Sequence, residues 1–325
     1  MLHKNVRYIE DATFEVSYNP QTEWKWLITI AFFCGELGAG LFLVSLFVTA
    51  LSGGSDPGVM AKLAFWAGLL GWLIVAGPKN LAHLVYLGQP WRFWRGLSRP
   101  GRSWITRGFY ATFSLCGFGM IYLWLYYDVA FGGASLSPIG QFIMVIAGFA
   151  AFVVMIYDGI VLTYSPSIPL WNNSLIPVMR TSYAIMGGVT LTLLVSMIPG
   201  LGVGFADGDL HLWEMIERAF VIANMLMIAV YVMTLTYQVS AAKESAFLMI
   251  RDKYPAIFWG GVVGIGLVAM GLIPILLGAS LELLLAVAIF ELIGDFCILF
   301  LLLRVGVFSP LMPRPNIDVS LFSKG

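Results

Sequence analysis

Ionisable and hydroxyl-bearing side chains interrupt several of the most apolar stretches of this 325-residue chain. A charged group inside a membrane costs roughly 3 kcal/mol or more, so such residues are functional candidates by default. Those nearest one end of their apolar stretches are Glu36, Lys79, His83, Tyr157, Asp158 and Arg180. The phenol and carboxyl of Tyr157 and Asp158 suit a quinone carbonyl and its protons. We therefore predict a quinone-binding and protonation site from these six residues.

Each of these residues also has a purely structural interpretation. Glu36 can pair with a neighbouring arginine, and Asp158 can form a salt bridge at a helix end beside an interfacial tyrosine. His83 can be an ordinary interfacial histidine. Their gathering at one depth is the stronger signal for a site.

A second set of acids lies deeper in the apolar stretches. Glu291 and Asp295 are four residues apart and so share one face of a helix, and Glu217 lies toward the opposite side of the membrane. These three carboxyl groups are candidates for a proton path. The alternative is that Glu291 and Asp295 pair with Arg304.

An arginine- and tryptophan-rich segment, "LGQPWRFWRGLSRPGRSW" at residues 87–104, connects two apolar stretches. Its arginines are spaced three, four and three residues apart, which favours one face of an amphipathic element in the membrane interface, although Pro100 and Gly101 interrupt it. Two interpretations stay open: an interfacial belt of aromatic and basic residues, or a docking surface for a partner protein. The predicted docking residues in this segment are Arg92, Phe93, Trp94, Arg95, Arg99 and Arg102.

The composition identifies the protein class. Hydrophobic residues make up 59% of the chain and charged residues only 11%, against roughly 25% charged residues in soluble domains. Eight apolar segments are long enough to cross a membrane as helices. They are residues 26–51, 59–87, 107–130, 137–163, 176–199, 213–238, 256–277 and 281–304. We predict an all-α integral membrane protein with eight transmembrane helices arranged as two four-helix bundles.

The predicted organisation follows the longest connection, between the fourth and fifth spans. It comprises a polar N-terminal tail (1–25), a first bundle (26–163) containing the interfacial loop 88–106, a second bundle (176–304) and a C-terminal tail (305–325). The N-terminal tail lacks the apolar core and small-residue cleavage site of a signal peptide. Glycines inside the spans, such as Gly38 and Gly40, favour close helix packing.

Positive charge is distributed unevenly about this topology. Eight spans place both termini on one side, which then carries sixteen of the eighteen lysines and arginines. The positive-inside rule reads that side as cytoplasmic, although arginines recruited to bind a partner would produce the same bias. The net charge is zero, which gives no indication of nucleic-acid binding.

Cysteine and histidine are too scarce to support redox centres. The three cysteines lie in apolar stretches without a CxxC or CxxCH pattern, and the three histidines provide no pair at one membrane depth. We therefore expect no haem, iron–sulfur cluster or metal in this chain.

Two segments resemble a known family. "LGQPWRFWRGLSRPGRSWITRG", which follows the second span, and "YDGIVLTYSPSIPLWNNSLIP", at the end of the fourth, are similar to signatures of the NrfD/PsrC family of polysulfide reductase membrane subunits. The small-residue run "GELGAGLF" in the first span fits as well, and the resemblance covers all eight spans in order.

The resemblance implies a quinone-binding membrane anchor of a respiratory oxidoreductase in a prokaryotic inner membrane, not catalytic on its own. Menaquinone or ubiquinone would be the bound cofactor. A four-cluster ferredoxin-like subunit would dock beside it and exchange electrons with a molybdopterin catalytic subunit. The family's quinone-site tyrosine maps onto Tyr157, and its Pro-x-Trp-Asn turn onto Pro169, Trp171 and Asn172, which adds the last two to the docking residues.

Two positions depart from the family pattern. The family more usually has glycine at position 36 and threonine at position 158, where this chain has acids. The main competing hypothesis is a proton-coupled secondary transporter with Glu36, Asp158 and Asp295 as coupling sites. A ligand-free structural anchor is the third.

Overall fold

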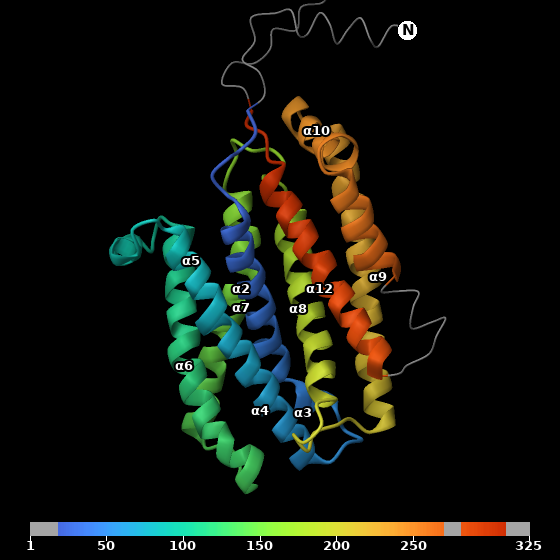
Figure 1. The fold of residues 1–325 in the computed structure, drawn as a ribbon. Helices are drawn as coiled ribbons and strands as arrows, with labels where there is room; N and C mark the ends of the chain where they lie inside the picture. The colour runs from blue at the N-terminus through green and yellow to red at the C-terminus, as the bar shows by residue number, and fades with distance from the viewer. Residues whose placement is uncertain (1–18, 270–280, 310–325) are drawn as a thin grey trace, which may run out of the picture.

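The described chain is a bundle of long helices that run between two ends (Figure 1). This computed structural model describes residues 19–269 and 281–309. Within those residues, seven helical segments are long and apolar enough to cross a membrane. Their order along the chain is α2 (Trp26–Ser45), α4 to α5 (Pro57–Tyr86), α6 (Trp104–Gly132), α7 (Pro138–Thr163), α8 (Leu175–Ser196), α9 (Asp207–Tyr237) and the Leu285–Arg304 part of α12.

These bounds confirm the all-helical membrane class and seven of the predicted spans. The remaining predicted span, 256–277, is described only in its first part, as the 14-residue helix η4 (Ala256–Ala269). Residues 270–277 of that span lie outside the described residues. So do most of both predicted tails.

Short elements connect or extend the spans. The first predicted span, 26–51, divides into α2 and a separate turn, α3 (Val48–Leu51). The second consists of α4 (Pro57–Ile74), the turn η1 (Val75–Lys79) and α5 (Asn80–Tyr86). The others are η2 (Pro90–Leu97) between α5 and α6, and α10 (Ser240–Phe247) and η3 (Leu248–Asp252) between α9 and η4.

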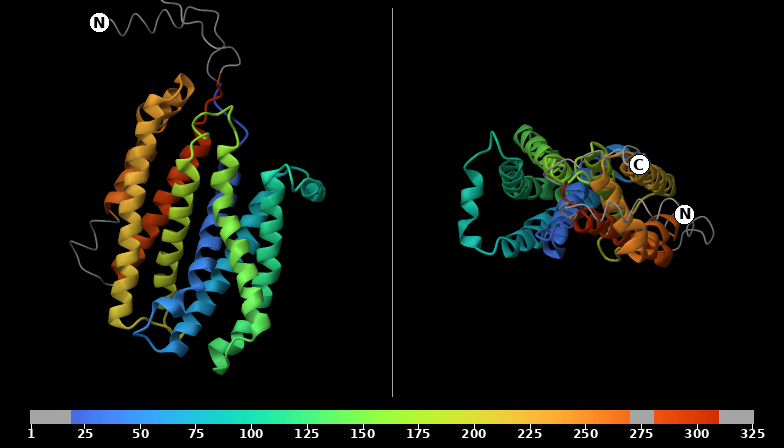
Figure 2. Two further views of the ribbon diagram at one scale, coloured as in Figure 1. Left: turned by 180° about the vertical axis from the view of Figure 1, so that it is seen from behind. Right: turned by 90° about the horizontal axis from the view of Figure 1, so that it is seen from above.

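Helices α2 and α8 form the centre of the bundle. Helix α2 packs against α4, α7, α8 and α12, and Figure 2 shows the surrounding helices from behind and from above. A methyl group at Gly40 or Gly188 would overlap the backbone of the facing helix, so α2 and α8 approach each other closely because both positions lack side chains. The prediction that the glycines of the first span favour close packing is confirmed at Gly40.

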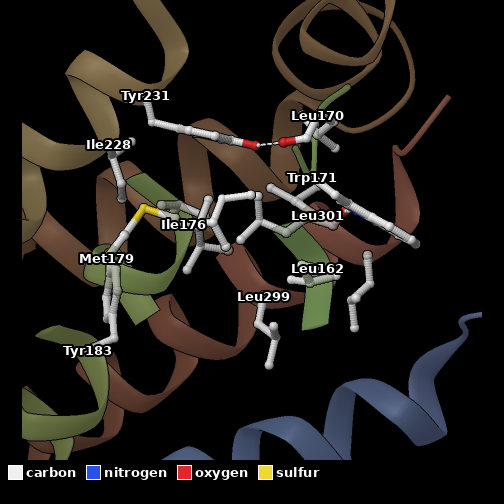
Figure 3. Packing of buried hydrophobic residues seen from close by; sticks show 14 of the residues in the cluster. Leu162, Leu170, Trp171, Ile176, Met179, Tyr183, Ile228, Tyr231, Leu299 and Leu301 are labelled. Carbon is white, nitrogen blue, oxygen red and sulfur yellow. Dashed lines mark hydrogen bonds between the residues drawn. The ribbon is translucent and has the colours of Figure 1, made fainter. Parts of the chain in front are cut away.

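Among the described residues, buried apolar side chains form two hydrophobic cores, and each takes residues from both predicted halves of the chain. One core includes Phe32 and Tyr157 together with residues of α9 and α12, and Figure 3 shows part of it around Trp171 and Tyr231. The division into two four-helix bundles remains a prediction.

Both ends of the described chain lie at one end of the bundle. The backbone N–H of Phe308 donates to the backbone carbonyl of Asn19 over 3.0 Å. The backbone N–H of Gln21 donates to the backbone carbonyl of Gly306 over 2.7 Å. The arginine-rich loop projects at the same end (Figure 1). We refer to this end as the termini end.

Candidate functional site

A cavity of about 240 Å³ lies near the termini end, between α5, α6, η2 and α7. Its wall is mostly apolar, with a few polar groups and one lysine. The lining residues are Lys79, Asn80, His83, Leu84, Leu87, Phe93, Ile105, Gly108, Phe109, Thr112, Phe113 and Tyr157. Three of the six predicted quinone-site residues, Lys79, His83 and Tyr157, therefore line one cavity.

A wide helical turn places Lys79 in that cavity. The turn η1 is π-helical, contains Pro78 and ends at Lys79. Such turns insert one extra residue and redirect the side chains that follow, frequently at functional sites. The buried Lys79 ammonium donates a close hydrogen bond to the hydroxyl of Thr112 on α6. The lysine is thereby held across the space between α5 and α6.

His83 stands one helical turn beyond Lys79. Its Nδ1 lies 3.1 Å from the Lys79 carbonyl oxygen. A carbonyl can only accept, so in the neutral ring Nδ1 carries the proton and donates it, and Nε2 is left as an acceptor. The half-buried His83 thus offers an unprotonated nitrogen at the cavity.

Tyr157 forms the inner wall of the cavity. Its side chain is only 8% exposed, and its hydroxyl has no hydrogen-bond partner among the described residues. Gly108 makes room for the ring, because a methyl group at that position would overlap it. Phe32 packs against both Tyr157 and His83. Its ring centroid lies 6.3 Å from that of Tyr157 and 6.0 Å from that of His83. The phenol is therefore rigidly placed and free to bond a ligand.

Asp158 lies behind the cavity instead of lining it. It is buried beside Gly35 of α2. A methyl group at Gly35 would stand 3.6 Å from Asp158 Oδ2 and 3.4 Å from Lys79 Cε. Lys79, which lines the cavity, and the buried Asp158 therefore both approach Gly35.

Glu36 and Arg180 belong to a fully buried ionic cluster with Asp295. Arg180 Nε donates to Glu36 Oε1 over 3.1 Å, and Arg180 Nη2 makes a closer bond with Glu36 Oε2. Arg180 Nη1 donates to Asp295 Oδ1 over 2.7 Å. One guanidinium thus links α2, α8 and α12. Neither Glu36 nor Arg180 lines the cavity, so the predicted six-residue site divides into two groups.

The deeper acids form a separate cluster. Thr190 Oγ1 on α8 lies 3.0 Å from Glu217 Oε1 on α9 and closer still to Glu291 Oε2 on α12. Asp295 is bound to Arg180 instead. Arg304 Nε contacts the Tyr254 hydroxyl over 3.3 Å, so the alternative pairing of Glu291 and Asp295 with Arg304 is not what the structure forms.

The arginine-rich loop contributes Leu87 and Phe93 to the cavity wall. Only Arg92 and Arg95 lie within the short helix η2, because Arg99 and Arg102 follow its end. The single helical face expected from the spacing is therefore not formed. All four arginines are exposed, and none has an ion-pair partner in the part of the chain that the structure describes.

The aromatic residues of the loop have different roles. Trp91 is 89% exposed and Trp94 is largely exposed, whereas Phe93 turns inward and lines the cavity. Thr106 Oγ1 donates to the Gly96 carbonyl over 2.5 Å and fixes the loop to the start of α6. Phe93, which we expected in a docking surface, is thus part of the cavity wall.

Trp171 is buried and does not present its ring to a partner. Its Nε1 donates to the Leu302 carbonyl over 2.7 Å, and its ring stacks on Trp24 at a centroid distance of 4.9 Å. Figure 3 shows Trp171 among the apolar core residues. The neighbouring Asn172 is at the surface and donates to the Thr163 carbonyl over 3.1 Å. Trp171 stabilises the connection between α7 and α8.

Sequence reasoning missed the contribution of α6 to the cavity. Gly108 and Thr112 are four residues apart and so share one helical face. A small residue one turn from a hydroxyl residue, near the end of an apolar span, was the available signal. Thr190 was also missed, because threonine is common in transmembrane helices and carries no charge.

Comparisons with known proteins identify the family of this chain. Residues 15–310 match the family described as "Polysulphide reductase, NrfD". The chain is also similar to "Protein NrfD homolog" of Haemophilus influenzae, with 24% identity over 179 residues. That similarity covers 53% of this chain and 53% of the relative, so the chain spans about half the length of the curated relative it matches.

Proposed function

The chain belongs to the NrfD family, whose members are membrane subunits that generally serve as quinone-interacting anchors of oxidoreductase complexes, and on that premise we propose that its cavity binds the head group of a membrane quinone or quinol. The bound molecule would be menaquinone or ubiquinone. The single observation that carries the proposal is the meeting of Lys79, His83 and Tyr157 at one largely apolar cavity.

The residues present fit such a ring. The volume of about 240 Å³ is somewhat below the roughly 300–1,000 Å³ of pockets that enclose a whole ligand. A head group alone would suit it, with the isoprenoid tail left in the lipid. Leu84, Ile105 and Phe113 line the cavity and are also exposed on the outer face of the bundle, so an apolar route for the tail is available.

Quinol oxidation supplies two electrons and two protons, and the chain's own groups can manage the protons. His83 Nε2 would accept a proton from a ring hydroxyl, while the Tyr157 hydroxyl donates a hydrogen bond to the other ring oxygen. Lys79, oriented by Thr112, would hold positive charge beside that oxygen. The second proton, from that other ring oxygen, would go to the buried carboxylate of Asp158 near Lys79.

The electron partner is part of the same proposal. Members of the family generally pair with iron–sulfur and catalytic subunits. The proposed docking surface consists of Arg92, Arg95, Arg99 and Arg102. These guanidinium groups are exposed and unpaired in the described chain, and they belong to the loop that also supplies Phe93 to the cavity wall, so they are available to acidic groups of a partner. The neighbouring subunit would be a four-cluster ferredoxin-like protein, with a molybdopterin catalytic subunit beyond it.

Proton translocation is a second element of the proposal. Buried acids continue from Asp158 through Glu36 and Asp295 to Glu291 and Glu217. Such groups inside a membrane are typical of proton relays. In this view quinol chemistry at the termini end would be coupled to proton movement through the second half of the bundle. A secondary transporter would use the same acids without quinol chemistry.

The test is quinol oxidation by native membranes that contain the complete complex. We expect Tyr157→Phe and His83→Ala each to lower the rate about 100-fold or more, the usual range for loss of a general acid or base. Tyr237→Phe is the matched control, because Tyr237 is exposed and does not line the cavity.

Two outcomes would contradict the proposal. Wild-type rates in both variants would favour a structural anchor that binds no quinone. Solute uptake by the isolated chain in vesicles, without any quinol dependence, would favour the transporter.

A further inference from the structure

A buried trio of side chains in the second half of the bundle has no part in the cavity. Glu217 on α9, Thr190 on α8 and Glu291 on α12 are 7%, 2% and 1% exposed. None of the three lines the quinone-site cavity. Their meeting joins three helices at a depth where each polar atom needs a partner.

Hydrogen-bond accounting limits how the trio can be protonated. A threonine hydroxyl has one proton to donate and two lone pairs that accept. Thr190 Oγ1 is nevertheless within hydrogen-bond distance of one oxygen of Glu217 and one oxygen of Glu291. It can donate to only one of them. The other contact is a hydrogen bond only if that carboxyl group carries a proton and donates it to Thr190.

The surrounding charges do not offer an alternative partner. On α8, Arg180 is bound by Glu36 of α2 and by Asp295 of α12. On α9, Arg218 lies 2.9 Å from Glu214. No other basic side chain contacts the trio within the described residues. Two carboxylates here would therefore be uncompensated negative charges in a low-dielectric interior.

The geometry favours Glu291 as the member that holds the proton. Its Oε1 is buried without any hydrogen-bond partner in the described part of the chain, which a carboxylate oxygen tolerates poorly. This oxygen faces α8 at Gly187, where a methyl group would stand 3.9 Å from it. Glu217 is the member near the Arg218 guanidinium, which lies 2.9 Å from Glu214.

We propose that Glu217, Thr190 and Glu291 form a site that binds one proton, with Thr190 as the positioning residue through which the proton passes between the two carboxyl groups. In the resting arrangement Glu291 donates to Thr190 Oγ1, and Thr190 donates to Glu217. In the transfer, the Glu291 O–H bond breaks as a new bond forms at Thr190 Oγ1. The original Thr190 proton moves to Glu217 Oε1. The net result is that one proton, and with it one positive charge, moves from Glu291 on α12 to Glu217 on α9.

The site itself does not depend on quinone chemistry, but its use in moving protons across the membrane rests on the proposed function. The experiment is therefore spectroscopic. Infrared spectra of the purified full chain in lipid are recorded in H₂O and D₂O, in the absence of quinone, to detect the carbonyl stretch of a protonated carboxyl group.

We expect one such band to be absent in Glu291→Gln. In Thr190→Val the band should move to higher frequency, because the O–H group of Glu291 loses the hydroxyl oxygen that accepts its hydrogen bond. Thr190→Ser, which keeps the hydroxyl, should restore the wild-type position. Glu214→Gln is the control and should leave the band unchanged, since Glu214 bonds Arg218 instead of Thr190.

Three outcomes would overturn the proposal. They are a spectrum without any band that Glu291→Gln removes, a band that is the same in Thr190→Val, or a band that sodium ions abolish at constant pH. The last would assign the trio to a bound cation. If Thr190→Val fails to fold, Thr190→Ser and Glu291→Gln still decide the question.

The same spectra separate this proposal from the proposed function. Tyr157→Phe should retain the band in full while quinol oxidation is lost. A retained band together with unimpaired quinol oxidation in Tyr157→Phe would contradict the quinone site alone. A missing band in an active wild-type complex would contradict the proton site alone.

Discussion

The Arg180 cluster and the cavity both contain polar side chains near the same end of the bundle, yet these side chains differ in whether they have hydrogen-bond partners. Around Arg180, each charged group has a bonded partner at the junction of α2, α8 and α12. In the cavity, the Tyr157 hydroxyl has no partner among the described residues, and the imidazole of His83 keeps one nitrogen free.

This difference separates structural from chemical roles. A buried charge whose partner is removed destabilises a protein, because it cannot be rehydrated. A polar group that faces a cavity without a partner contributes little to stability and stays available to a ligand. Removing groups from the two regions should therefore affect stability and activity in opposite ways.

The largest effect is expected from Arg180→Met. This change leaves Glu36 and Asp295 buried side by side without their common cation. We expect the free energy of unfolding to fall by about 3–5 kcal/mol, measured by denaturation in mixed micelles. Arg218→Met is the control: its pair with Glu214 is half exposed, and such pairs are worth at most about 1 kcal/mol. If both variants lost the same free energy of unfolding, the proposed difference between the Arg180 cluster and the cavity would be contradicted.

A smaller effect is expected from Gly108→Ala, which changes the wall of the cavity. The added methyl group overlaps the Tyr157 ring and must displace it. We expect stability to fall by about 1–3 kcal/mol through overpacking, and quinol binding to weaken because the cavity is narrowed. Gly117→Ala, on the same helix, has open space around it and should change neither measurement. Quinol binding by both variants in detergent provides the comparison.

Two tyrosines sharpen the contrast at the level of a single hydroxyl. The Tyr231 hydroxyl donates to the Leu170 carbonyl over 2.8 Å (Figure 3). Tyr231→Phe leaves that buried carbonyl unpaired and should cost about 1–2 kcal/mol. Tyr157→Phe breaks no hydrogen bond within the described residues and should change stability by less than about 0.5 kcal/mol. A larger loss in Tyr157→Phe than in Tyr231→Phe would contradict the assignment of Tyr157 to chemistry.

The smallest effect on stability is expected from the loop. Replacing Arg92, Arg95, Arg99 and Arg102 by glutamine should change the free energy of unfolding by less than about 0.5 kcal/mol per residue, because all four are exposed and unpaired in the described chain. Binding of the iron–sulfur subunit should weaken, and its dependence on salt should flatten. Lys62→Gln, at the opposite end of the bundle, is the control, and partner binding that falls equally in it would argue against a docking surface.

Composition and apolar length predicted the membrane class and most span boundaries, because the cost of unpaired backbone groups in lipid leaves few alternatives to helices. The site was predicted in part. Lys79, His83 and Tyr157 do meet at one cavity, because the second and fourth predicted spans end at the same membrane face.

The rest required three-dimensional contacts. Spacing along one helix does not reveal that Arg180 joins Glu36 to Asp295 across 144 and 115 residues of sequence. Nor does it show that Trp171 turns inward to reach the Leu302 carbonyl while Asn172 stays at the surface. Such choices depend on packing between distant helices, which no local pattern in a single sequence contains.

The Arg180 junction also has a consequence for how the chain is made. Glu36 is synthesised in the first span, 144 residues before the arginine that holds it, and Asp295 comes in the last span. During translation the first helix must enter the bilayer with a carboxyl group that has no counter-charge, and so in neutral form or beside the insertion machinery. In ribosome-bound chains that stop before residue 180, alkali should therefore extract the first span easily from the membrane. Once α12 has been synthesised, the first span should resist extraction.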